Sequence, residues 1–103
     1  MRHQLTKVIV DHYPVLIVEF DDGIAGKVDM TNDIANKPMF VELRNPALFN
    51  KVSIGRNGDC LGWKLDEVGN EIDLSADGLR NAIEIQLVKT RAAQHRASRQ
   101  AAE

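Results

Sequence analysis

Short runs in which apolar and polar residues alternate fill the first part of the chain. Residues 5–10 and 15–20 are rich in valine, isoleucine and leucine, a composition typical of β-strands. Tyr13-Pro14 separates the two runs, because proline cannot continue the hydrogen-bond ladder of a strand. Asp22-Gly23 is among the strongest short hairpin signals, and residues 24–29 follow it as a returning strand. The pattern predicts an antiparallel meander of three strands.

Between residues 31 and 50 the pattern changes to short helical turns that prolines interrupt. Thr31-Asn32-Asp33 is suited to cap a first turn, which ends before Pro38. Asn45-Pro46 ends a second turn and starts a third, because proline is favoured at a first helical position. We expect these turns to place three large apolar side chains on the sheet, namely Phe40, Leu43 and Phe49.

A hairpin is predicted after these turns. Residues 51–54 and 60–65 resemble strands, and Asn57-Gly58 between them supplies the positive φ that a tight turn needs. Residues 66–71 are polar and contain Gly69-Asn70, which predicts a loop.

The end of the chain is predicted to be one long helix. Ser75 is a suitable N-cap, Asp77 places an acid in the first turn, and no proline or glycine follows Gly78. From Lys89 onward alanine is the only apolar residue type. The first half of this helix therefore carries almost all of its apolar surface.

That surface is distributed over more than one side of the helix. Leu79, Ile83 and Leu87 recur at i, i+4 and i+8, which is one helical face. A second stripe consists of Ile85, Val88 and Ala92. Two interpretations follow: both stripes are buried within one chain, or the excess apolar surface contacts another chain.

Together these elements predict a single α+β domain of 103 residues. Its sheet is small and mainly antiparallel, a meander plus a hairpin with about five strands. Residues 1–74 form the sheet-based core with its short helical turns, and residues 75–103 form the C-terminal helix of the same domain. Aromatic residues are only 5% of the chain, so valine, isoleucine and leucine must supply most of the core. The large core residues that we expect are Phe20, Phe40, Leu43, Phe49 and Trp63.

Cysteine content and the first residues of the chain bear on its location. Cys60 is the only cysteine, so no internal disulfide indicates an oxidising compartment. Residues 1–4 lack a secretory pattern, and the apolar run 15–18 is far too short to span a membrane. We expect a cytoplasmic protein that does not contact a membrane.

Candidate catalytic and metal-binding groups are few. His3, His12 and His95 follow no metal-ligand spacing, and Cys60 has no neighbouring partner cysteine. Asp21, Asp22 and Asp29 lie on or beside one hairpin, where turn chemistry already favours an Asp-Gly pair. We therefore predict no enzyme activity, no cofactor and no metal. Paired carboxylates would carry chemistry only if Asp22 and Asp29 met a further carboxylate in a cleft.

Two binding hypotheses remain. In the first, the protein docks a protein partner or a second copy of itself through Leu79, Ile83, Leu87 and Val88, with Trp63 nearby. In the second, a basic helix end binds nucleic acid: residues 1–74 carry 8 Lys/Arg and 12 Asp/Glu (−4), whereas residues 75–103 carry 5 and 3 (+2). The cations concerned are Lys89, Arg91, Arg96 and Arg99. The pI of about 5.9 favours the first hypothesis.

Most of the chain, from about Val8 to Leu79, resembles a bacterial family known as domain of unknown function 2442. The resemblance rests on motifs in a fixed order: Phe20-Asp21-Asp22-Gly23, Gly26-Lys27-Val28-Asp29, residues 40–49 (Phe-Val-Glu-Leu-Arg-Asn-Pro-Ala-Leu-Phe), Gly58, Trp63 and Ile72-Asp73-Leu74-Ser75. The segment after Trp63 is longer here than in the family. The long C-terminal helix lies outside the common core.

The resemblance implies a compact α+β domain and no activity, cofactor or catalytic residue. Members resemble accessory proteins: some carry an appended helix-turn-helix domain, and many are encoded beside another small protein, as in toxin–antitoxin pairs. This chain has no room for such a domain after Ser75, which weakens the nucleic-acid hypothesis. The expectation is a non-catalytic interaction module, antitoxin-like or regulatory, that acts through protein–protein association.

Overall fold

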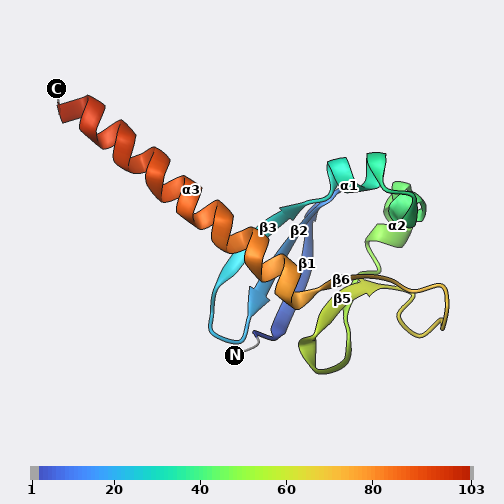
Figure 1. Ribbon diagram of the computed structural model, residues 1–103. Helices are drawn as coiled ribbons and strands as arrows, with labels where there is room; N and C mark the ends of the chain where they lie inside the picture. The colour runs from blue at the N-terminus through green and yellow to red at the C-terminus, as the bar shows by residue number, and fades with distance from the viewer. Residues whose placement is uncertain (1–2, 103) are drawn as a thin grey trace.

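A computed structural model describes residues 3–102, with side chains for residues 3–89. The fold is α+β, as predicted, with two small antiparallel sheets, short helical turns and a long C-terminal helix (Figure 1). The first sheet contains β1 (Leu5–His12), β2 (Val15–Phe20) and β3 (Ala25–Asp29) in the order β1-β2-β3. This meander confirms the prediction from the alternating pattern and the two turns.

The second sheet differs from the prediction. It contains β4 (Ser53–Ile54), β5 (Cys60–Trp63) and β6 (Ile72–Ser75), in the order β4-β5-β6. β5 ends at Trp63 and not at residue 65, because Lys64 adopts a left-handed conformation with φ of 57°. β6 was not predicted, since its four residues carry little periodic signal; it forms by pairing with β5, Leu74 opposite Leu61.

Short helical elements lie between the strands, three of them between the two sheets and one between β4 and β5. They are α1 (Thr31–Asn36), the 3₁₀ helix η1 (Pro38–Arg44), α2 (Pro46–Phe49) and the 3₁₀ turn η2 (Arg56–Gly58). Asn45 caps α2, since its side chain accepts a hydrogen bond from the Ala47 amide at 3.0 Å. Thr31 begins α1 and does not cap it; the Asp29 carboxylate accepts from the Thr31 amide at 2.9 Å. Asn57 and Gly58 have the positive φ predicted for this turn, 58° and 72°.

One face of β2 forms the centre of the core. Leu16 and Val18 are fully buried and Phe20 is 1% exposed, because alternate residues of the strand face the same side. The other predicted core residues, Phe40, Leu43, Phe49 and Trp63, are at most 2% exposed. The predicted core is therefore confirmed.

Helix α3 (Ala76–Ala102) begins in the core and runs beyond it (Figure 1). Ser75 is its N-cap, since the Ser75 hydroxyl oxygen accepts from the Gly78 amide at 3.1 Å. The helix contacts β3 and β6. At β3 the approach is close: a Cβ on Gly26 would lie 2.8 Å from Cγ2 of Ile83. Of the described helices, none is long and apolar enough to cross a membrane.

Candidate association surface on helix α3

The predicted contact residues divide into a buried and an exposed group. Trp63 is fully buried, Ile83 is 1% exposed and Leu79 is 7% exposed. The Trp63 indole also donates a hydrogen bond to the Phe49 carbonyl oxygen at 2.8 Å. These three side chains belong to the core of one chain, so they are not available to a partner in this fold. For them, the interpretation of burial within one chain is the correct one.

The remaining predicted contact residues lie on the outside of α3. Leu87 is 42% exposed and Val88 is 67% exposed, and the neighbouring Ile85 is 48% exposed. Leu87 continues the stripe of Leu79 and Ile83 but, unlike them, is not buried. Helix α3 itself runs on past the sheets (Figure 1). Three large apolar side chains within four residues therefore face solvent.

Ile85 and Val88 occupy a different side of the helix from this stripe. Successive residues of a helix are about 100° apart. Ile85 and Val88, which come two and five residues after the buried Ile83, therefore point away from the core. Ile85 was recognised as part of the second stripe but not chosen as a contact residue. The sequence signal for it was its i, i+3 spacing to Val88.

The predicted nucleic-acid surface lies almost wholly outside the described side chains. Lys89 is exposed. Arg91, Arg96 and Arg99 are outside the residues whose side chains the structure describes. The nucleic-acid hypothesis therefore stays a prediction from the sequence.

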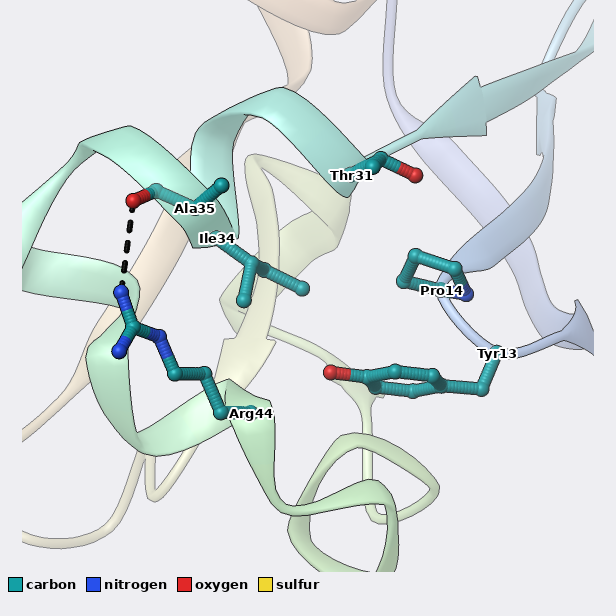
Figure 2. A pocket seen from close by; sticks show the side chains of 6 residues that line it. All are labelled: Tyr13, Pro14, Thr31, Ile34, Ala35 and Arg44. Carbon is teal, nitrogen blue, oxygen red and sulfur yellow. Dashed lines mark hydrogen bonds between the residues drawn. The ribbon is translucent and has the colours of Figure 1, made fainter.

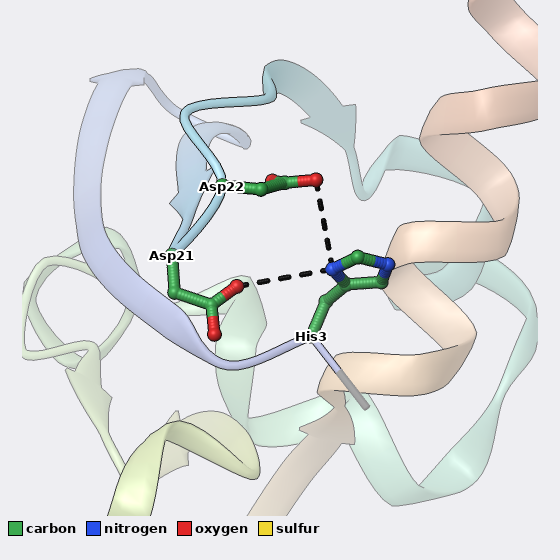
Figure 3. Close-up of side chains that lie close together, drawn as sticks. All are labelled: His3, Asp21 and Asp22. Atoms are coloured by element: carbon green, nitrogen blue, oxygen red, sulfur yellow. Dashed lines mark ion pairs between the residues drawn. The ribbon is translucent and has the colours of Figure 1, made fainter. Parts of the chain in front are cut away.

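Two carboxylates of the first hairpin, Asp21 and Asp22, lie beside the same histidine (Figure 3). Nδ1 of His3 lies 3.8 Å from Asp21 and 3.5 Å from Asp22, and these three side chains have the spacing of possible metal ligands. Both Asp22 oxygens, however, accept from the Arg80 guanidinium, at 2.8 and 2.7 Å. A cation bound here would have to displace this bidentate pair, so we propose no metal site for the cluster. Asp29 lies apart, bonded to Thr31.

Arg80 therefore connects the β2–β3 turn to helix α3. Besides Asp22, its guanidinium contacts Glu84 at 2.8 Å and lies 5.1 Å from the centre of the Phe20 ring. The hydrogen bonds from Arg80 hold the pKa of Asp22 well below its usual range, and the amide of Ile24 adds to this effect. The same pair raises the pKa of Arg80.

We predict that Asp22→Asn lowers the urea midpoint at neutral pH and that the loss fades in acid. The folded-state pKa of Asp22 lies below the unfolded value of about 3.9, so the ion pair stabilises the fold above that pH. Its contribution is lost as the pH falls through the folded-state pKa. The difference in midpoint between wild type and Asp22→Asn should therefore be largest at pH 7 and shrink below about pH 4.

Asp21→Asn is the matched control, since Asp21 lies in the same turn and, among the residues whose side chains are described, its carboxylate has an ion-pair contact with His3 alone. It should shift the midpoint less than Asp22→Asn at pH 7. Two results would contradict this role of the Arg80–Asp22 ion pair. One is an equal decrease of the urea midpoint for both variants, and the other is a decrease for Asp22→Asn that is as large in acid as at pH 7.

Comparisons with known proteins add no identity to these observations. No protein-family model matches the chain, and neither a curated protein nor a solved structure matches it significantly.

Proposed function

We propose that this protein is a non-catalytic interaction module, of the accessory kind implied by the resemblance to domain of unknown function 2442, and that it associates with a second copy of itself through α3. The observation that carries the proposal is the exposed apolar surface of Ile85 and Val88, with Leu87 also exposed on another side, on a helix that extends past its own sheets. An antitoxin-like or regulatory role fits a protein whose main feature is such a surface.

Association would stabilise this part of α3 in two ways. Burying a large aliphatic side chain is worth about 1.5–3 kcal/mol relative to full exposure, and these side chains are about half exposed or more. A helix that leaves its domain also lacks tertiary packing, and isolated helices shorter than roughly 12–15 residues are marginal in water. A partner chain along Ile85 and Val88 supplies both contributions.

A second copy is the occupant that the charges favour. Residues 75–103 carry a net charge of +2, whereas residues 1–74 carry −4. In a twofold dimer each helix meets the other chain, so the basic segment of one copy lies near the acidic body of its partner. A helix that is apolar on two sides can contact its own sheet with one side and the second copy with the other.

We expect wild-type protein to behave as a dimer in light scattering coupled to size exclusion, and Val88→Asp to behave as a monomer. A buried aspartate at the centre of the contact should weaken dimerisation roughly 30-fold or more. Because Val88 is exposed in one chain, far-UV circular dichroism should remain that of a folded protein.

Val68→Asp is the control: Val68 is 96% exposed on the loop between β5 and β6, and its replacement should leave the dimer intact. A monomeric wild type at all concentrations would refute self-association. A Val88→Asp variant that remains dimeric would move the contact away from this part of α3.

A further inference from the structure

Two shallow pockets lie side by side where α1 meets the turn after β1, far along the chain from the exposed part of α3. The first has a volume of about 380 Å³ and is lined mainly by Tyr13, Pro14, Ile34 and Arg44 (Figure 2). The second, of about 310 Å³, is lined by the residues following α1 and by Val41. Ala35 and Arg44 belong to both. The two pockets therefore form one surface with Arg44 at the boundary.

Most of this surface is apolar. Tyr13 is 37% exposed and Val41 is 48% exposed, and Met39 on the same helical segment is 56% exposed. Exposed tyrosine and arginine beside aliphatic side chains are the composition found at the energetic centres of protein contacts. The surface therefore has the composition of a binding site.

Arg44 supplies an unneutralised positive charge to this apolar surface. Among the described residues, no carboxylate lies within ion-pair distance of its guanidinium. One of its nitrogens donates to the Ala35 carbonyl oxygen at 3.3 Å, which leaves most of its donors free (Figure 2). The neighbouring Lys37 is already paired with Asp33 at 3.0 Å. A carboxylate is the group that a free guanidinium fork binds best.

The Tyr13 side chain, which lines the first pocket, is held in place before any ligand arrives. The Tyr13 hydroxyl donates to the Leu43 carbonyl oxygen at 2.8 Å. The Tyr13 ring also meets the buried Phe49 ring edge-to-face, with 5.1 Å between centroids. Since little conformational entropy is lost on binding to a preorganised surface, even a small ligand can bind with measurable affinity.

We propose that this surface binds a short segment of another protein in which an acidic side chain is flanked by apolar side chains. The carboxylate binds Arg44, and one apolar side chain enters each pocket. A peptide is favoured over a small metabolite because both pockets are shallow and would leave most of a small molecule in solvent, whereas ligand sites normally bury most of the ligand. This site does not depend on the proposed dimer, since none of its residues lies on α3.

The test is a titration of the full ¹⁵N-labelled chain, observed by two-dimensional NMR, with a pool of capped peptides. Each peptide contains one aspartate with leucine, phenylalanine or valine on both sides, either adjacent or separated by one serine. We expect shift changes concentrated at Tyr13, Ile34, Ala35, Val41 and Arg44. The same pool with asparagine in place of aspartate should bind about 10-fold more weakly or worse, because a charge-assisted hydrogen bond is lost.

Arg44→Gln should weaken binding of the aspartate pool by a similar factor. Arg44→Lys keeps the charge but loses the two parallel N–H donors of the guanidinium, so its affinity for the aspartate pool should lie between those of wild type and Arg44→Gln. Arg56→Gln, at an exposed arginine of η2, is the matched control and should bind as wild type does. No shift changes at millimolar peptide, or equal binding of both pools, would overturn the proposal. Isovalerate binding as tightly as the peptides would also overturn it, because a single small carboxylate would then suffice.

Discussion

Trp63→Ala is expected to remove a large part of the stability of this domain. Trp63 is fully buried, its ring lies 5.6 Å from that of Phe49, and its indole donates to the Phe49 carbonyl oxygen. Truncation of a buried tryptophan to alanine costs about 3–5 kcal/mol, and domains of this size are stable by about 5–15 kcal/mol. Urea unfolding followed by far-UV circular dichroism measures the loss, since the variant lacks the tryptophan that fluorescence would report.

Trp63→Phe separates packing from hydrogen bonding. It retains an aromatic ring but leaves the Phe49 carbonyl oxygen without its donor, and we expect a loss of about 1–3 kcal/mol. Val41→Ala, at a residue that is 48% exposed, should change the stability by no more than about 0.5 kcal/mol. If Trp63→Ala lowered the free energy of unfolding no more than Val41→Ala does, the burial of Trp63 in the core would be contradicted.

Gly62→Ala is expected to disrupt the second sheet. Gly62 is in β5, opposite Asp73 of β6, and an added Cβ would lie 2.2 Å from the carbonyl oxygen of Ile72 and 3.0 Å from Cα of Asp73. Both contacts are with backbone, so β5 and β6 must separate to accept the methyl group. We expect a loss of about 3 kcal/mol or more, at the upper end of what overpacking usually costs, measured by urea unfolding.

Gly26→Ala is the comparison, because its added Cβ would meet a side chain and not backbone. The nearest atoms belong to Ile83, at 2.8 and 2.9 Å. A small movement of α3 away from β3 can relieve this contact without breaking a strand pairing, so we expect a smaller loss, about 1–3 kcal/mol. If Gly62→Ala proved as mild as Gly26→Ala, the tight pairing of β5 with β6 would be contradicted.

Features that depend on neighbouring residues were predictable from the sequence. The Asp22-Gly23 and Asn57-Gly58 turns, the Asn45-Pro46 helix start and the Ser75 cap each depend on a few adjacent residues, and all are present. The large core residues were also predictable. Phe20, Phe49 and Trp63 are among the few aromatic residues of the chain, and a small domain needs its few large apolar side chains in the core.

Pairing between distant segments was decided only by the tertiary structure. The second sheet has a third strand because β6 pairs with β5 across a loop, and no local pattern in four residues predicts such a partner. The ion pair of Arg80 with Asp22 joins residues 58 positions apart. Likewise, Tyr13 meets Arg44 at one pocket because the turn after β1 is adjacent to α1.

Helix α3 combines a feature that neighbouring residues determined with one that only the tertiary structure decided. Its sequence determined a helix with two apolar stripes, because helical periodicity is a property of neighbouring residues. Which part of those stripes is covered depended on where the sheets end: Leu79 and Ile83 are buried, whereas Ile85, Leu87 and Val88 are exposed. Both groups are equally apolar in sequence, and burial is a relation between a side chain and the surface that covers it. The sequence therefore supplied the apolar helix, and the arrangement of the sheets decided which of its residues are left for a partner.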